Sequence, residues 1–315
     1  MDARCHPAPR TKRVTLTCPS CGGVADLSKT PACPMCRWTA TVQAGVVNLL
    51  SDGDKSHPGF ADYSRNYDRI ADDDLNSPIL DLQYVQRQAA NLCRIARDVR
   101  GLEILDLGCG QGFLTRMLMS NGAKSVAAVD ISSAYLSRLA GLPGVVPILA
   151  NAEKLPFQEA FDLVVSTDVM EHVLNVGSFL ISLNDSLRMD GRAIIRVPYR
   201  ENLIAYAAQT GCRYEFVHLR AFNRRLLHET LAGAGLKVER TSLDGFSMYS
   251  PQRFWIAGPR RKAAYLKLQE WALSKVDHPS TVTTWPWPLA ALFMRPAEIV
   301  VVARKIRPAI DRAAA

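Results

Sequence analysis

Short apolar stretches alternate with amphipathic ones through most of the chain after residue 100. Seven of the short stretches have the length and the apolar character of buried strands. They are Glu103–Leu107, Ser125–Asp130, Val145–Ala150, Phe161–Ser166, Arg192–Val197, Lys237–Leu243 and Glu298–Arg304. The helices between them are expected to begin near Phe113, Ser133, His172 and Asn223. Apolar strands separated by helices predict an α/β fold with a parallel, Rossmann-like sheet that is covered on both faces.

An amphipathic helix is predicted in front of the first strand. Ser77 is suited to the N-cap and Pro78 to the first turn of this helix. Apolar residues then recur at spacings of three and four, at Leu82, Val85, Ala89, Leu92, Ala96 and Val99. The segment Ser51–Gly59 has the turn-forming composition of a linker, so a domain boundary is expected there.

Composition and charge narrow the class of protein. The chain has 315 residues, of which 48% are hydrophobic and 22% charged, and this excludes a wholly disordered protein. The net charge is +8, but residues 51–191 carry 19 acidic and only 12 basic side chains, so the positive charge lies toward both ends. No apolar run approaches the about 20 residues of a membrane span, and no apolar segment follows the basic N-terminus. We therefore expect a soluble, cytoplasmic protein.

Half of the eight cysteines are concentrated in two CxxC pairs, Cys18/Cys21 and Cys33/Cys36. Two such pairs match tetrahedral coordination of Zn²⁺ by four thiolates, each pair contributing two sulfurs from one tight turn. A redox dithiol is the alternative, but it needs one CxxC beside a βαβ unit and not two that face each other. We predict a structural zinc site, because four thiolates leave no open coordination position.

Polar residues and glycines that are candidates for ligand binding follow the predicted strands. The first strand runs into Asp106-Leu-Gly108-Cys-Gly110-Gln-Gly112, and the second ends at Asp130, where a carboxylate can accept hydrogen bonds from ribose hydroxyls. NAD is one possible ligand of such a loop. Two features argue against it: the acid before the first glycine is suited to an ammonium group, and polar signatures also follow the third and fourth strands, at Asn151-Ala152-Glu153 and from Ser166 to His172.

This set of motifs, in this order, resembles the class I S-adenosylmethionine (SAM)-dependent methyltransferases over about residues 60–245 and the last strand. The resemblance implies a seven-stranded sheet whose last strand is inserted antiparallel beside the sixth. It implies that SAM is the cofactor and that the glycine loop holds its methionine end. The residues expected to contact SAM are Tyr67, Asp106, Gly108, Gly110, Asp130, Ile131, Asn151, Ala152 and Asp168.

The stretch Asp168-Val-Met-Glu171-His172-Val looks like the Glu-x-x-Glu-His-Val stretch of ubiquinone-pathway O-methyltransferases. Some relatives bind a divalent ion with those acids, but Asp168 replaces the first Glu here, so we expect no ion. His172 is a candidate general base, and His218 is a second candidate because related enzymes place a histidine there near the acceptor pocket. For each histidine a purely structural role is the alternative.

Residues 18–50 look like the zinc ribbon of bacterial rRNA guanine methyltransferases, which use it to help hold RNA. Similar ribbons also precede enzymes that act on small molecules, and Trp38 is the only aromatic residue of the ribbon available for base stacking. The resemblance of the core to ubiquinone-pathway enzymes favours a small-molecule acceptor over rRNA or tRNA. We therefore predict methyl transfer to an oxygen of a small molecule, with an RNA methyltransferase as the alternative.

The predicted organisation has four parts: a tail and zinc ribbon (1–50), a SAM-binding core (51–245), an insertion (246–296), and a final strand with a tail (297–315). The insertion contains a predicted helix through Val276 and the apolar stretch Trp285–Met294. The insertion is interpreted as a lid over the acceptor, and the alternatives are a homodimer interface and a membrane-surface patch.

Overall fold

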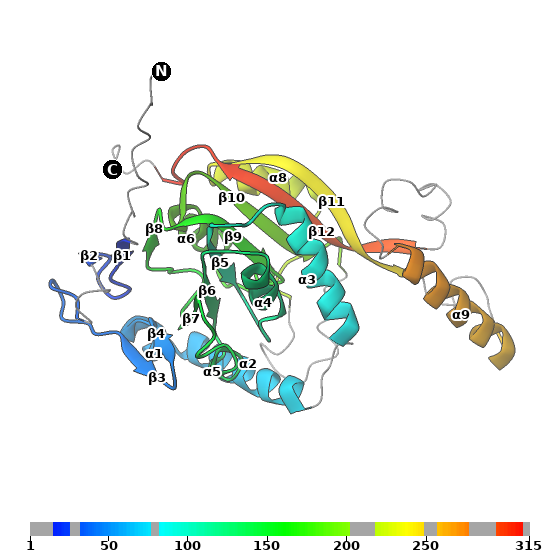
Figure 1. Ribbon diagram of the computed structural model, residues 1–315, viewed down its shortest axis with the longest axis horizontal. Coiled ribbons are helices and arrows are strands. Elements are labelled where there is room, and N and C mark those ends of the chain that lie inside the picture. The colour runs from blue at the N-terminus through cyan, green and yellow to red at the C-terminus, as the bar shows by residue number, and fades with distance from the viewer. Residues whose placement is uncertain are drawn as a thin grey trace, which may run out of the picture.

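Nine strands form the central sheet in the part of the chain that the structure, a computed structural model, describes (Figure 1). That part covers residues 15–25, 32–76, 82–201, 218–248, 257–276 and 294–310. All seven predicted strands are present, as β5 (Glu103–Leu107), β6 (Ser125–Asp130), β7 (Val145–Leu149), β9 (Phe161–Thr167), β10 (Leu187–Pro198), β11 (Leu236–Met248) and β12 (Met294–Lys305). The predicted α/β class with a mostly parallel sheet is therefore confirmed.

The order of the strands is β11-β12-β10-β9-β5-β6-β7-β4-β3. Neighbours from β10 to β4 run parallel to one another. In contrast, β12 pairs antiparallel with both β10 and β11, and Val301 lies opposite Ile195 on one side and Thr241 on the other. The last strand is thus inserted beside the sixth, as the resemblance implies.

Helices cover both faces of the sheet because successive side chains of a strand point to opposite faces. Their bounds are α3 (Leu82–Ala96), α4 (Phe113–Ser120), α5 (Ser133–Ser137), α6 (Val176–Ser186) and α8 (Arg224–Gly233). On β5, Ile104 packs in a cluster with residues of α3 and α4, while the next residue, Leu105, packs in the cluster that contains α6 and α8. Strands buried in this way read as continuous apolar runs, which is the pattern in the sequence.

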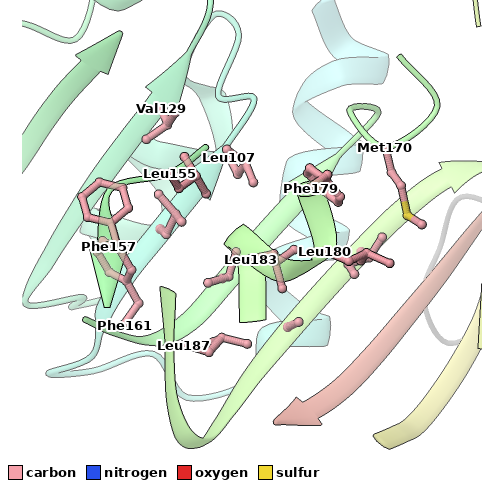
Figure 2. Packing of buried hydrophobic residues seen from close by; sticks show 14 of the residues in the cluster. Leu107, Val129, Leu155, Phe157, Phe161, Met170, Phe179, Leu180, Leu183 and Leu187 are labelled. Atoms are coloured by element: carbon pink, nitrogen blue, oxygen red, sulfur yellow. The ribbon is translucent and has the colours of Figure 1, made fainter. Parts of the chain in front are cut away.

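The packing of α6 brings the hydrophobic core up to one end of the sheet. Figure 2 shows Phe179, Leu180 and Leu183 of α6 lying over the strands, with Leu107 and Val129 nearby. Met170 belongs to the same cluster and is fully buried. This cluster therefore supports the loops that follow β5, β6 and β9.

The N-terminal segment is part of this fold and does not precede it as a separate ribbon. Its first strand, β1 (Thr15–Thr17), pairs with β2 (Val24–Ala25) and also with β8 (Phe157–Gln158) of the core. Its last two strands, β3 (Thr41–Gln43) and β4 (Val46–Asn48), extend the central sheet beside β7. The packing is thus continuous across the boundary predicted at residue 50.

Two predictions about helices were wrong. The segment predicted as a linker forms α1 (Asp52–Ser56) and the start of α2 (Pro58–Asn76), because Ser51 and Asp54 form a capping box. The helix predicted to begin near His172 begins at Val176, because the side chain of Asn175 caps it by accepting a hydrogen bond from the Ser178 N–H. The predicted start of α3 at Ser77-Pro78 lies outside the described residues.

The predicted helix of the insertion is α9 (Pro259–Val276), which Figure 1 shows extending away from the sheet beyond the end of β11. Most of the apolar stretch from Trp285 lies outside the described residues, so the lid stays a prediction. Among the helices that the structure describes, none has both the length and the apolar character needed to cross a membrane.

Candidate active site

A cavity of about 850 Å³, part of it open to solvent, lies where β5, β6, β7 and β9 end. Open α/β sheets bind their ligands at this edge. The cavity is lined by all but one of the residues predicted to contact the cofactor, namely Tyr67, Gly108, Gly110, Asp130, Ile131, Asn151, Ala152 and Asp168. His172 lines it as well, so residues predicted for two different roles share one wall.

The glycine loop after β5 allows a ligand to approach the backbone. Gly108 has φ 78°, and a Cβ at this position would lie 2.2 Å from a methyl group of Val169 on the loop after β9. The N–H of Gly108 donates to the Val129 carbonyl at 2.8 Å, which ties the loop to β6. Any side chain at position 108 would therefore push apart the two loops that form this side of the cavity.

Asp130 is held at the end of β6 by backbone N–H groups. One carboxylate oxygen accepts from Gly110 N and the other from Ser132 N, each at 2.9 Å. Burial raises the pKa of Asp130, whereas these N–H groups lower it. Each oxygen can still accept a further hydrogen bond from a ligand hydroxyl, so the side chain suits the predicted ribose contact.

Asp106 is the one predicted cofactor residue that does not line the cavity. It is 2% exposed and accepts a hydrogen bond from the Thr115 hydroxyl at 2.6 Å, on the side of the sheet that α4 covers. Burial raises the pKa of Asp106 to about 6. The structure thus gives this acid a place behind the glycine loop, where it supports α4.

The roof of the cavity comes from α2. Phe60, Tyr63 and Tyr67 line the cavity at helical spacing, and the rings of Tyr63 and Tyr67 are 4.7 Å apart. Farther along α2, Asp74 accepts from the Gln111 amide at 2.6 Å and from the Tyr135 hydroxyl at 2.9 Å, which fastens the helix to the glycine loop and to α5. Phe60 and Asp74 were missed because no helix was predicted between the linker at Ser51–Gly59 and Ser77. The spacing of Phe60, Tyr63 and Tyr67 was the available signal.

The two candidate bases lie beside each other. Their rings meet edge to face with centroids 4.5 Å apart, and the His172 ring also meets Tyr67 at 5.8 Å. His218 forms ion pairs with Glu201 and, at 4.0 Å, with Glu171. Only His172 of the two lines the cavity, so His218 stands behind it.

The acids of the Asp168–Glu171 stretch have separate surroundings. Asp168 lines the cavity and forms an ion pair with Arg196 of β10. Glu171 is fully buried, and burial raises its pKa well above the usual range. Possible metal-ligand atoms of Glu171, His172 and His218 lie within 4.8 Å of one another, and Asp168 is not a member of this group.

The four cysteines of the two CxxC pairs converge. Cys18 and Cys36 have their sulfurs 3.6 Å apart, and the sulfurs of Cys21 and Cys33 are 3.7 Å apart. Four thiolates at about 2.3 Å from a tetrahedral Zn²⁺ would lie about 3.8 Å from one another, so these spacings fit the ion. Trp38 is only 8% exposed and packs in the core, so it is not available for stacking on an RNA base.

Comparison with known proteins agrees with this site. Residues 105–195 match the family model described as methyltransferase domain, which spans the glycine loop, Asp130, Asn151 and His172. The chain is 35% identical over 99 residues to a tRNA U34 carboxymethyltransferase of Shewanella baltica. That match covers 29% of this chain and 30% of the length of that relative.

Solved structures show the same fold. A methyltransferase in complex with the Haloferax volcanii Trm112 methyltransferase activator has a TM-score of 0.53 and 15% identity, over 78% of this chain and 98% of that one. The Burkholderia thailandensis 1,6-didemethyltoxoflavin-N1-methyltransferase, with bound 1,6-didemethyltoxoflavin and S-adenosylhomocysteine, has a TM-score of 0.50 and 18% identity, over 80% of this chain and 92% of that one. The chain therefore has the fold of these proteins, and residues 105–195 match a methyltransferase domain.

Proposed function

We propose that this chain is a SAM-dependent methyltransferase that transfers the methyl group to an oxygen of a small-molecule acceptor. The observation that carries the proposal is the cavity itself, in which the glycine loop, Asp130 and His172 share one wall within the matched methyltransferase domain. Activity, acceptor and partners are inferred for the whole chain, because the matched segment covers only 30% of the length of the curated relatives.

The residues that line the cavity suit SAM in their chemical character. Leu107, Val129 and Tyr67 give it apolar surfaces, the Gly108 backbone leaves room for a ligand, and Asp130 offers hydrogen-bond acceptors. When bound, SAM supplies a methyl group on a sulfonium centre, and the transfer is an in-line displacement.

His172 is the proposed general base. A hydroxyl group is mostly protonated at neutral pH and is then a poor nucleophile, and a neutral imidazole can remove its proton as the new bond forms. His218, with Glu171 and Glu201 around it, packs edge to face against His172 and can hold the His172 ring in place. His218 is therefore proposed as a positioning residue and His172 as the catalytic one.

We further propose that Cys18, Cys21, Cys33 and Cys36 hold one structural Zn²⁺. Support comes from the sulfur spacings of 3.6 and 3.7 Å and from the all-thiolate set, which leaves no position open for a substrate.

The experiment that tests the function uses SAM with a labelled methyl group. The purified chain is incubated with this SAM and either a collection of hydroxylated and phenolic metabolites or bulk tRNA and rRNA. Label in a small molecule supports the proposal, whereas label in RNA alone favours the alternative of an RNA methyltransferase. The argument for that alternative is the similarity to the Shewanella tRNA U34 carboxymethyltransferase.

The Asp130→Ala variant tests the cofactor assignment in the same preparation. Loss of charge-assisted hydrogen bonds to a ribose should weaken SAM binding by about 10- to 100-fold in calorimetric titration. Unchanged affinity in this variant would contradict SAM binding in this cavity.

A further inference from the structure

The four-cysteine segment and the cavity are joined through β3, β4 and α1, and then by hydrogen bonds from Asp54 to the residues that line the cavity. We propose that Asp54 is a positioning residue that couples metal loading of the four cysteines to cofactor binding. The inference rests on the proposed function in one respect, namely that the cavity binds SAM.

The first step is the attachment of the cysteine segment to the core on both sides of the cluster. Directly before Cys18, the N–H of Thr17 donates to the Pro156 carbonyl at 2.8 Å. After the cluster, the chain continues through β3 and β4, and the N–H of Leu49 donates to the Leu149 carbonyl at 2.8 Å. An ion that holds the four sulfurs together therefore fixes the path of the chain between two contacts with the core.

The second step runs from β4 to Asp54. Only Leu50 lies between the Leu49 contact and the capping box of α1. In this box, Ser51 Oγ donates to Asp54 Oδ2 at 2.6 Å, and the N–H of Asp54 donates to Ser51 Oγ at 3.0 Å. Asp54 is 4% exposed, so its carboxylate is held by protein groups on every side. The position of Asp54 thus depends on the position of the C-terminal end of β4.

The third step places Asp54 against the wall of the cavity. Asn151, which lines the cavity at the end of β7, donates from Nδ2 to Asp54 Oδ1 at 3.0 Å. The amide oxygen of Asn151 accepts from the Glu153 N–H at 2.9 Å, so both ends of the amide are engaged and its orientation is set. Without the carboxylate of Asp54, the amide would be free to turn.

The fourth step extends the effect to the wall that carries His172. The carboxylate of Glu153 accepts from the N–H groups of Leu174 and Asn175, at 2.8 and 3.1 Å. Leu174 lines the cavity two residues after His172. The connection from the cysteines through Asp54, Asn151 and Glu153 therefore reaches both Asn151 and Leu174, which line the cavity.

The same helix offers a matched control. Asp52 lies in the first turn of α1, two residues before Asp54, and its side chain is 82% exposed with Lys55 as its ion-pair partner at 3.8 Å. An Asp52→Ala change removes one carboxylate from this helix without touching the capping box or Asn151.

The experiment measures SAM binding by calorimetry in four full-length proteins, each zinc-loaded and each after removal of zinc by a chelator. The proteins are the wild type, Asp54→Ala, Asp54→Asn and the Asp52→Ala control. Zinc removal should weaken SAM binding to the wild type and to Asp52→Ala by about tenfold. Zinc-loaded Asp54→Ala should bind SAM about tenfold more weakly than the wild type, and zinc removal should then have little further effect. Asp54→Asn keeps an oxygen that can accept from Asn151, so it should retain most of the affinity.

Coupling between two sites is reciprocal, which provides a readout without catalysis. Saturating SAM should strengthen zinc retention by the wild type, measured by transfer of zinc to a chromogenic chelator, by the same factor of about ten, and should not do so in Asp54→Ala. Equal SAM affinity with and without zinc, or an Asp54→Ala variant in which zinc removal keeps its full effect, would overturn the inference. Failure of the zinc-loaded wild type to bind SAM would instead overturn the proposed function along with it.

Discussion

At the scale of single residues, the two histidines can be separated by their places in the site. His172 lines the cavity, while His218 touches it through the His172 ring and lies between two glutamates. The sequence suggested both as bases. Their geometry is consistent with the proposal that His172 is the base and that His218 positions its ring.

His172→Ala is expected to lower the rate of methyl transfer at pH 7 by about 10²- to 10⁴-fold, while SAM affinity changes by no more than a few-fold. His218→Ala should cost less, because the base remains. Both deficits should shrink as the pH rises toward the pKa of the acceptor, since an ionised acceptor needs no base. A pH–rate profile for both variants checks this. Methyl-transfer rates equal to that of the wild type in both variants would show that the two histidines have only structural roles.

Asp106 is a residue whose charge opposes folding at neutral pH. Burial raises its pKa to about 6, against an ordinary value of 3.8, so the folded chain binds this proton more tightly than the unfolded chain does. The stabilising contribution of this group is therefore complete below about pH 4 and is lost as the pH rises through about 6.

Asp106→Asn removes this titration and keeps an oxygen that can accept from Thr115. Relative to the wild type, the variant should gain about 2 kcal/mol of unfolding free energy between pH 4.5 and pH 7. Urea unfolding at the two pH values measures the gain, and Asp52→Asn, at an exposed position, should show none. An equal pH dependence in Asp106→Asn and wild type would mean that Asp106 stays ionised in the fold.

At the scale of secondary-structure elements, α2 is the feature that most changes the picture of the site. It supplies the aromatic roof of the cavity, and its acidic side chains bond to the glycine loop and to α5. Asp68 accepts from the Ser133 N–H at 3.1 Å, and Asp74 accepts from Gln111 and Tyr135. Burial and the nearby Asp74 carboxylate raise the pKa of Tyr135, so its hydroxyl remains a donor.

Asp74→Ala should release α2 from the glycine loop and from α5. We expect SAM to bind about tenfold more weakly, mainly through faster dissociation, because the roof is no longer held closed. Stopped-flow measurement of SAM release checks this, with Asp73→Ala at an exposed position of the same helix as the control. A dissociation rate equal to that of the wild type would show that α2 is held without Asp74.

At the scale of the whole molecule, the cysteine segment and the sheet form one cooperative unit. Strand β1 pairs with β8, β4 pairs with β7, and Cys18, Cys33 and Trp38 belong to the same hydrophobic cluster as Leu105 and Phe179. An independent ribbon would share neither strands nor core with the methyltransferase domain.

Removal of zinc should therefore lower the melting temperature of the entire chain, by about 5 °C or more, in a single transition. Calorimetry of loaded and stripped protein measures this, and Cys93→Ser, which changes a cysteine of α3 outside the cluster, should leave the difference intact. A separate early transition, with the main one unmoved, would indicate an independent ribbon.

Much of the fold and most of the cofactor wall could be predicted because their signals are local. A strand buried on both faces is an apolar run such as Leu163–Val165, and a parallel sheet brings the ends of its strands to one edge, so Gly108, Asp130 and Asn151 meet wherever the sheet forms. The two CxxC pairs can be recognised in the sequence because the spacing of their cysteines is typical of zinc ligands. These properties depend on near neighbours along the chain, and the sequence alone determined them.

Only the tertiary structure decided which distant side chains meet. Asp54 and Asn151 lie 97 positions apart, and nothing in the composition of Ser51–Gly59, which reads as a linker, announces their contact. The sequence also gives no sign that Trp38 is buried, that Asp106 lies behind the glycine loop, or that the rings of His172 and His218 are in contact. Such contacts are selected by packing across the folded molecule, so no spacing along the chain records them.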